Sequence, residues 1–211
     1  MTPLALTVVD HPLVTHRVAQ LRATTTASAE FRRVTAELST FLAYEAARDL
    51  PTVQTAVPTP LDVDAPAKTL PERTPLLVPI LRAGLGLLDG VVAAIPSAEV
   101  GLIGLARNEE THQPEPYCLR LPAELPTTAF VLDPMLATGG SMAWTCRLLR
   151  DRGVTDVVAI CLIAAPEGVA RVEAEVPEVR IVTAALDDHL NDDAFIVPGL
   201  GDAGDRLYGR V

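Results

Sequence analysis

Cysteine is scarce in this sequence, and its placement argues against two kinds of structural support. The 211 residues include three cysteines, Cys118, Cys146 and Cys161, and no pair has the Cys-x-x-Cys spacing common in zinc sites. Two of the three fall in apolar segments, where a thiol usually acts as a small core residue. The sequence therefore predicts neither a disulfide framework nor a zinc centre.

Long apolar runs are also missing. No run approaches the roughly 18 residues that a membrane-spanning helix needs, so no membrane association is expected. Residues 1–10 have no basic region ahead of an apolar core, and no small-residue cleavage site follows. We therefore expect no secretory signal, and the predicted location is the cytoplasm.

Positive charge is in deficit. The 17 lysines and arginines against 27 acidic residues give a net charge of -10, which opposes long-range attraction to the phosphates of nucleic acids. Nucleic acid is therefore not an expected partner. A small anionic substrate would need a locally positive pocket.

The length and the order of apolar segments predict the fold class. At 211 residues the chain favours a single domain over residues 1–211. Apolar residues at helical spacing predict two helices within residues 15–50, and a proline-rich stretch at 52–75 predicts extended strands outside the central sheet. Beyond them, predicted strands at 76–80, 100–106, 129–133, 157–164 and 180–184 alternate with predicted helices at 84–95, 141–152 and 166–175.

This alternation predicts an α/β fold with a mostly parallel central sheet flanked by helices. The core should span about 76–186. Segments at about 51–75 and 187–211 should form a small accessory hood. A polar excursion at 108–122 interrupts the pattern, and the tail from residue 187 is rich in turns and carries no long helix.

An acidic residue and a glycine-rich turn follow the strand predicted at 129–133. Asp133 should lie at the carboxyl end of the sheet, where open parallel sheets bind their ligands. Gly139 and Gly140 let the backbone approach an anion, and the amides of residues 137–141 with the following helix N-terminus supply donors. The stretch suits a phosphate monoester; the plainer alternative is a tight turn capped by Ser141. It lacks the lysine of the GxxxxGK[ST] loop, which disfavours an NTPase.

Two arginines also follow predicted strands. Arg82 comes after the strand at 76–80 and Arg107 after the strand at 100–106, so both should reach the same sheet edge as Asp133. Two guanidinium groups there could clamp a pyrophosphate with paired hydrogen bonds. Alternatively, each is an ordinary surface ion-pair partner. The polar stretch after Arg107 is long enough to fold over a site.

The tail contains the most specific string, at residues 195–206. Its Gly199, Gly201 and Gly204 match the dinucleotide pattern GxGxxG, but only seven residues follow Gly204, too few for the helix and strand that the pattern requires. A dinucleotide site is therefore rejected. The plain alternative is a terminal turn that shields the core.

These strings together resemble the type I phosphoribosyltransferases, and among them the uracil phosphoribosyltransferases. The resemblance covers nearly the whole chain, including residues 11–14, 42–46 and 187–191. It implies that Arg82, Arg107 and Asp202 contact phosphoribosyl pyrophosphate (PRPP), and that the excursion after Arg107 is a β-hairpin flap. The remaining implied PRPP contacts are Asp133, Pro134, Met135, Leu136, Ala137, Thr138, Gly139, Gly140 and Ser141, with Asp133 on the ribose hydroxyls and the turn on the 5-phosphate.

The resemblance also implies a uracil site at Ile196, Gly201, Asp202 and Ala203. Uracil presents an acceptor, a donor and an acceptor, which backbone groups could match, whereas cytosine reverses two of these groups. Each unpaired buried contact would cost about 1–3 kcal/mol, so a rigid backbone discriminates well. The chain departs from the family at three positions, where Ala106 and Phe195 replace tyrosine and Ala194 replaces glycine.

The implied reaction is transfer of the phosphoribosyl group of PRPP to uracil, which gives UMP and pyrophosphate in pyrimidine salvage. The expected catalytic residues of this pentosyltransferase are Arg82, Arg107, Asp133 and Asp202. Mg²⁺ is the expected cofactor, bound by Asp133 and Asp202 directly or through water. The residues indicate no base for uracil N1, and the four histidines have no metal-ligand spacing.

Three alternatives remain at this stage. One is transfer to another base, such as orotate or a purine; one is an RNA-binding regulator on the same fold; one is a nucleotide-binding module without activity. The acidic balance disfavours the regulator. The resemblance further implies a homo-oligomer, dimer or tetramer, and GTP as an activator.

Overall fold

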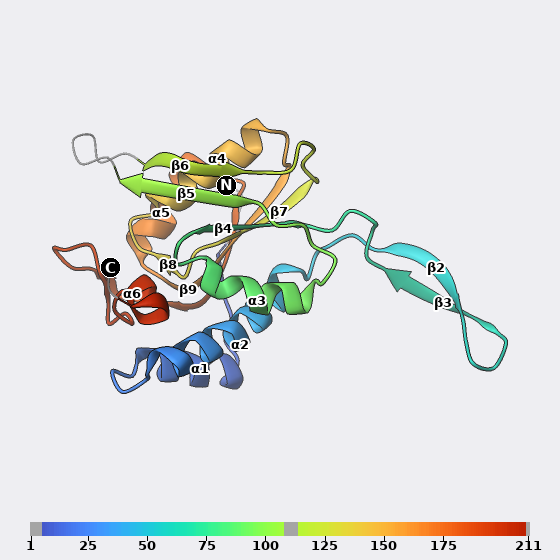
Figure 1. Cartoon of the computed structure of the whole chain (residues 1–211), viewed down its shortest axis with the longest axis horizontal. Coiled ribbons are helices and arrows are strands. Elements are labelled where there is room, and N and C mark those ends of the chain that lie inside the picture. Colours follow the sequence, from blue (N-terminus) through green and yellow to red (C-terminus); the bar gives the residue numbers. More distant parts are fainter. Residues whose placement is uncertain (1–5, 108–113, 210–211) are drawn as a thin grey trace.

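A mostly parallel sheet runs through the centre of the protein (Figure 1), whose computed structural model describes residues 6–107 and 114–209. Neighbouring strands are parallel except β5 and β6, which form an antiparallel hairpin. The α/β class with a parallel central sheet is thereby confirmed. Across the sheet the order is β1 (Leu6–Val8), β10 (Arg180–Leu186), β9 (Asp156–Ala164), β7 (Thr128–Leu132), β4 (Leu76–Leu81), β5 (Leu102–Arg107) and β6 (Pro114–Arg120).

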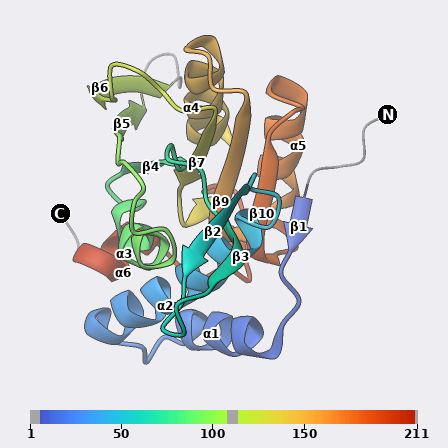
Figure 2. The ribbon, with the colours of Figure 1, turned by 90° about the vertical axis from the view of Figure 1, so that its right-hand side faces the viewer.

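Helices cover both faces of this sheet (Figure 2). Successive side chains of a strand point to opposite faces, and β7 therefore supplies two separate cores. Phe130 and Leu132 join the core beneath α1 (Pro12–Arg22), α2 (Ser28–Ala46) and α3 (Leu85–Ala94). Ala129 and Val131 face α4 (Gly140–Asp151) and α5 (Pro166–Glu175). Among the described residues, no helix has both the length and the apolar character needed to cross a membrane.

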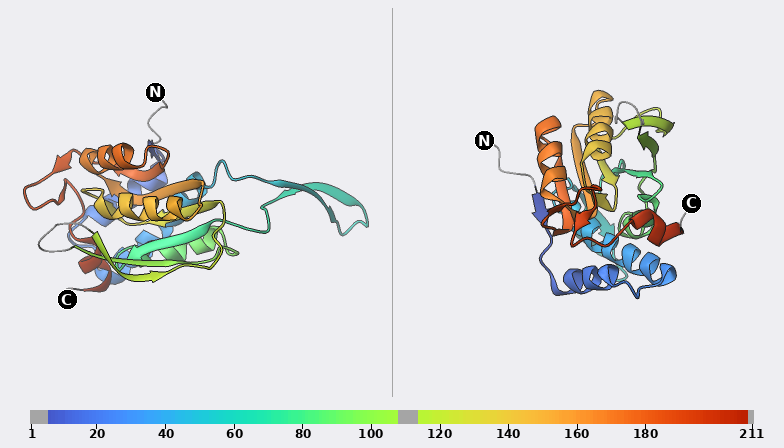
Figure 3. Two further views of the ribbon diagram at one scale, coloured as in Figure 1. Left: turned by 90° about the horizontal axis from the view of Figure 1, so that it is seen from above. Right: turned by 90° about the vertical axis from the view of Figure 1, so that its left-hand side faces the viewer.

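The stretch predicted to form strands outside the central sheet forms a separate antiparallel hairpin. It consists of β2 (Val53–Pro58) and β3 (Asp64–Thr69). Every residue of β2 is exposed, and the hairpin projects from the body on the side opposite the C-terminal segment (Figures 1 and 3). The proposed grouping of this stretch with the tail into one hood stays a prediction.

The tail contains more regular structure than the sequence indicated. It forms the two-stranded pair β11 (His189–Leu190) and β12 (Ile196–Val197), followed by the short helix α6 (Ala203–Tyr208). The polar excursion also contains a strand, β6, which completes the hairpin with β5. Residues 108–113, at the end of the predicted flap, lie outside the described residues.

Candidate active site

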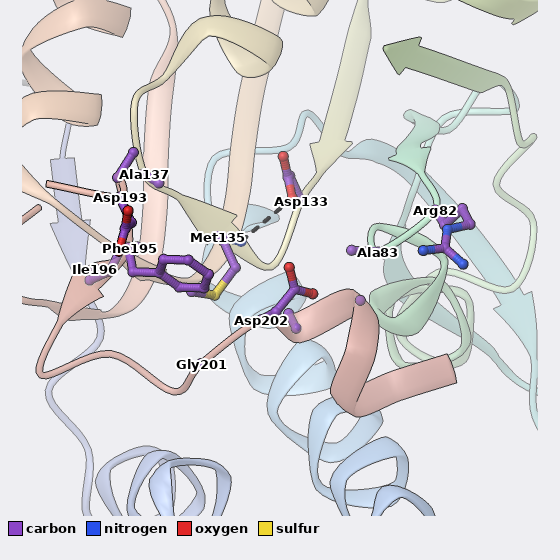
Figure 4. A pocket seen from close by; sticks show the side chains of 13 residues that line it. Arg82, Ala83, Asp133, Met135, Ala137, Asp193, Phe195, Ile196, Gly201 and Asp202 are labelled. Carbon is purple, nitrogen blue, oxygen red and sulfur yellow. Dashed lines mark hydrogen bonds between the residues drawn. The ribbon is translucent and has the colours of Figure 1, made fainter. Parts of the chain in front are cut away.

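A cavity of about 380 Å³ opens at the carboxyl ends of the parallel strands, and three separate segments line it. From the loops after β4 and β7 come Arg82, Ala83, Asp133, Met135 and Ala137. From the tail come Asp193, Ala194, Phe195, Ile196, Gly201, Asp202, Ala203 and Gly204 (Figure 4). The cavity therefore brings together eight of the residues predicted from the sequence: Arg82, Asp133, Met135, Ala137, Ile196, Gly201, Asp202 and Ala203.

Asp133 directly follows β7, which delivers it to the edge of the sheet. It opens to the cavity, but most of its surroundings are protein, and this desolvation raises the pKa of the carboxyl group to about 7. A hydrogen bond at 3.5 Å from the backbone N–H of Met135 to Asp133 Oδ1 acts in the opposite direction. The carboxyl group therefore changes its charge near neutral pH.

The glycine turn is packed so tightly that it accepts no side chain. Gly139 has φ of +76°, and a Cβ there would lie 2.6 Å from the carbonyl oxygen of Gly168 in α5. The short strand β8 (Met135–Leu136) pairs with β9 just before the turn and fixes its entry. Helix α4 then begins at Gly140, so its N-terminal amides face the open edge of the sheet.

The other residues of this loop lie beside the cavity lining. Pro134 and Leu136 are buried, whereas Thr138 is exposed. Gly139, Gly140 and Ser141 form the start of α4. None of these six is among the described residues that line the cavity.

An arginine that the sequence analysis missed packs against this turn. A Cβ on Gly140 would lie 3.0 Å from Nη1 of Arg171, which belongs to α5. Arg171 Nε donates to Glu175 at 2.7 Å, and the same carboxylate also pairs with Arg147. Two arginines thus share one carboxylate, which leaves a net positive charge beside the turn. Only the packing of α4 against α5 reveals this arginine, because it lies 31 residues beyond Gly140.

The structure describes the side chain of one of the two predicted arginines. Arg82 lies just after β4 and lines the cavity. Arg107 is the last residue of β5, and its side chain lies outside the described part of the chain. The predicted clamp by both guanidinium groups therefore stays a prediction.

The tail reaches the cavity through a series of turns. Gly199 and Gly201 have φ of +65° and +79°, in the left-handed region that favours glycine. The Asp202 side chain caps α6, because its Oδ1 accepts a hydrogen bond from the backbone N–H of Asp205 at 2.8 Å. Its carboxylate projects into the same space as Asp133 and Arg82, from a different element (Figure 4).

Long-range hydrogen bonds hold the start of this tail. Arg22 at the end of α1 donates to the buried carboxylate of Asp187 with two nitrogens, one at 2.8 Å. The same arginine donates to the Gly199 carbonyl at 2.7 Å, and the Gly199 N–H donates to Asp187 at 2.9 Å. These three residues form a closed network between α1, the residue that follows β10 and the turn at Gly199.

A second arginine holds the end of the tail. Arg206 in α6 donates to the carbonyls of Leu200 and Ala23 at 2.8 Å each, and also to the carbonyl of Leu21. Its guanidinium stacks 4.2 Å from the centre of the Phe31 ring. Partial burial lowers the pKa of Arg206 from its ordinary value.

Within residues 6–107 and 114–209, the described side chains that line the cavity do not supply the expected positive pocket. One guanidinium, Arg82, faces three carboxyl groups, Asp133, Asp193 and Asp202. Among the described residues, no group of three or more His, Cys, Asp or Glu side chains could hold a metal by itself. In the described part of the chain, Arg82 is the one cationic side chain that lines the cavity.

Comparisons with known proteins show the family to which the chain belongs. The family model for uracil phosphoribosyltransferase matches residues 8–210. The uracil phosphoribosyltransferase of Nocardioides sp. is 54% identical over 97% of this chain and 98% of the relative. That of Streptomyces coelicolor is 53% identical over 99% of this chain and 100% of the relative.

Solved structures show the same likeness. The AQ2163 protein of Aquifex aeolicus superposes with a TM-score of 0.91 at 39% identity, covering 97% of this chain and 98% of that one. Adenine phosphoribosyltransferase of Trypanosoma brucei shares the fold, with a TM-score of 0.57 at 14% identity over 88% of this chain and 85% of that one. The chain belongs to the uracil phosphoribosyltransferase family.

Proposed function

We propose that the cavity binds PRPP and uracil and transfers the phosphoribosyl group to uracil, which yields UMP and pyrophosphate. This is the reaction for which the family is named, and it places the chain in pyrimidine salvage. One observation carries the proposal: the loops after β4 and β7 and the tail line a single cavity. A donor substrate and an acceptor base can therefore meet in it.

The PRPP half of the site is the loop after β7. In the proposal, the amides of residues 137–141 and the N-terminus of α4 hold the 5-phosphate. Asp133 accepts hydrogen bonds from the ribose hydroxyls, and the loop residues from Pro134 to Ser141 shape the cradle. Arg82, with Arg107 from the end of β5, binds the pyrophosphate.

The uracil half is the tail. Ile196, Gly201, Asp202 and Ala203 present backbone groups to the base, held in place by the networks of Arg22 and Arg206. A fixed set of backbone donors and acceptors pairs with uracil and leaves groups unpaired against cytosine. This rigidity supports the choice of uracil over other bases.

In the proposed mechanism, catalysis depends on stabilising the charges that develop as the bond to pyrophosphate breaks. Breaking the bond from the anomeric carbon to pyrophosphate builds positive charge on the ribose and negative charge on the leaving group. Arg82 and Arg107 stabilise the leaving pyrophosphate, whereas Asp133 and Asp202 lie on the ribose side. The anchored 5-phosphate keeps the anomeric carbon between pyrophosphate and base.

Mg²⁺ fits this donor set. It is a hard ion that binds through one or two carboxylates together with substrate phosphates and water, and Asp133 and Asp202 line the cavity from two elements. When bound it would neutralise pyrophosphate charge in a cavity whose described lining includes three carboxyl groups and Arg82. Asp133 and Asp202 would hold it directly or through water.

The projecting hairpin supports a homo-oligomer, either a dimer or a tetramer. An isolated two-stranded hairpin is marginally stable in water, yet β2 and β3 expose Val53, Val57 and, in their connection, Leu61 and Val63. A second copy of the chain could cover these side chains. Light scattering on the purified protein measures the state directly.

Two further expectations can be tested directly. GTP as an activator is tested by assaying the protein with and without GTP. A cytoplasmic location is tested by fractionating the cells that express it.

The decisive experiment mixes the protein with PRPP, Mg²⁺ and one free base at a time, then measures nucleotide and pyrophosphate. Uracil should give UMP, whereas cytosine, orotate and hypoxanthine should give no product. Arg82→Ala should lower kcat/KM by about 100-fold or more. Asp202→Asn should also lower turnover while leaving the fold intact, because asparagine caps a helix as well as aspartate does. Product with another base, or unchanged kinetics in both variants, would refute the assignment.

A further inference from the structure

One exposed side chain organises the loop between β11 and β12. Asn191 Oδ1 accepts hydrogen bonds from the backbone N–H of Asp193 at 3.1 Å and of Phe195 at 2.8 Å. The backbone of Asn191 adds two more bonds, from its N–H to the Phe195 carbonyl and from the Ala194 N–H to its own carbonyl, both at 2.9 Å. Asn191 is thus the partner of three successive amides.

The loop that Asn191 closes is part of the cavity wall. Asp193, Ala194 and Phe195 line the cavity, and Ile196 follows at once as the first residue of β12. Ala194 has φ of +63°, a conformation that an alanine rarely adopts without support. A loop held in this shape delivers both the Phe195 ring and the Ile196 backbone to the cavity in one arrangement.

The loop would not keep this shape unaided. Asp192 and Asp193 are adjacent, both exposed, and their like charges favour a more open loop. Neither contributes to either core, so packing does not order them. The four hydrogen bonds of Asn191, together with the pairing of Leu190 with Ile196 at the base of the loop, hold the loop against this opening.

We propose that Asn191 is a positioning residue for the base: its carboxamide oxygen keeps the loop of residues 192–195 closed, so that uracil meets a preformed wall. The proposal rests on the proposed uracil site. Its physical basis is that a loop ordered in advance spares the ligand the entropy of ordering it. The effect should therefore fall mainly on uracil, because the loop of residues 192–195 belongs to the proposed uracil half of the cavity.

The test compares Asn191→Ala with Asn191→Asp in steady-state kinetics for both substrates. Alanine removes the acceptor, and water replaces it on the exposed amides, so the melting temperature should change little. We expect KM for uracil to rise about 5- to 20-fold and KM for PRPP to stay within about twofold. Aspartate keeps an oxygen acceptor but adds a third like charge beside Asp192 and Asp193, so KM for uracil should fall between the parent value and that of the alanine variant.

Three further variants complete the experiment. Glu124→Ala, which breaks only an exposed ion pair with Arg73, serves as the control, with both KM values unchanged. Ala194→Gly keeps the Asn191 bonds and removes the strain of a left-handed alanine, so KM for uracil should stay within about twofold of the parent value. Asn191→Leu, which fills a similar volume without an oxygen acceptor, tests the proposal if Asn191→Ala were to misfold, with KM for uracil raised to the same extent.

The outcomes separate this proposal from the function it rests on. An unmodified protein that makes no UMP from uracil would overturn both. An active protein in which Asn191→Ala leaves KM for uracil unchanged would overturn the positioning role alone. So would equal increases of both KM values, or an Asn191→Asp variant as impaired as the alanine variant.

Discussion

The two halves of the cavity are built in different ways. The phosphate loop is one continuous stretch between β7 and α4, and its shape follows from tight backbone packing against α5. The tail depends on side chains from distant parts of the sequence, with Arg22 and Asp187 separated by 165 positions. We therefore expect substitutions in its own backbone to impair the phosphate loop. Substitutions of distant side chains should impair the tail.

The largest expected effect comes from adding one methyl group to the phosphate loop. Gly139→Ala places a Cβ 2.6 Å from the Gly168 carbonyl, so the backbone that surrounds the phosphate must move. We expect kcat/KM for PRPP to fall by about 100-fold or more, measured by steady-state kinetics. Gly153→Ala is the matched control, because Gly153 has φ of +95° but meets nothing within 4 Å. Equal losses of kcat/KM in both variants would mean that backbone strain at a left-handed residue, and not the contact with Gly168, causes the effect.

Breaking the contact between the tail and its remote partner Arg22 should have the next largest effect. Asp187→Ala deletes the acceptor of Arg22 and of the Gly199 N–H. We expect KM for uracil to rise roughly 10- to 50-fold and the free energy of unfolding to fall by about 1–3 kcal/mol. Denaturant unfolding and kinetics measure the two effects. Glu124→Ala, which breaks the exposed pair with Arg73, should change neither; a selective loss of PRPP binding in Asp187→Ala would contradict the division into halves.

The charge of Asp133 should make the phosphate half sensitive to pH. With a pKa of about 7, the carboxylate is about 9% ionised at pH 6 and about 91% at pH 8. If the ionised form binds ribose and Mg²⁺, kcat/KM for PRPP should rise about tenfold over this range. A profile that is flat between pH 6 and pH 8 would contradict this role.

The same pKa predicts a conflict between stability and function. The raised pKa means that the folded protein is destabilised when the buried Asp133 carboxyl group is ionised. The contribution of this group to the free energy of unfolding is therefore highest below pH 3.8, the pKa in the unfolded state, and falls as the pH rises through about 7. Asp133→Asn should therefore gain stability over the parent with rising pH, by at most about 4 kcal/mol at pH 8, while losing activity. Thermal melts at pH 5 and pH 8 measure the difference; an equal gain at both would refute it.

The smallest expected effect concerns the arginine beside the phosphate turn. Arg171→Ala removes a partly exposed positive charge that packs on Gly140 and should raise KM for PRPP about two- to fivefold. Arg147→Ala also removes one positive charge, and Arg147 pairs with the same carboxylate, that of Glu175. It lies seven positions along α4 from Gly140, about 10 Å at helical rise, and should have less effect. Equal effects would indicate that only net charge matters.

Much of the fold could be predicted because its segments are long and regular. The alternating strands and helices from residue 76 to residue 186 were predicted in the correct order, with ends within a few residues of those observed. β1, β8, β11 and β12 escaped prediction, because strands of two or three residues have too little periodicity to identify. α6 was missed for the same reason, since its six residues follow a glycine-rich string.

The sequence by itself determined the parts that are local: the strand that ends at Asp133, the glycine turn after it and the family likeness of the tail. Backbone chemistry explains this, because a left-handed turn at Gly139 or a helix start at Gly140 depends on neighbouring residues. Only the tertiary structure decided which side chains meet across long separations. Arg171 against the phosphate turn, Arg22 on Asp187 and the cavity shared by Asp133 and Asp202 arise when sheet and helices pack, and no local pattern records them.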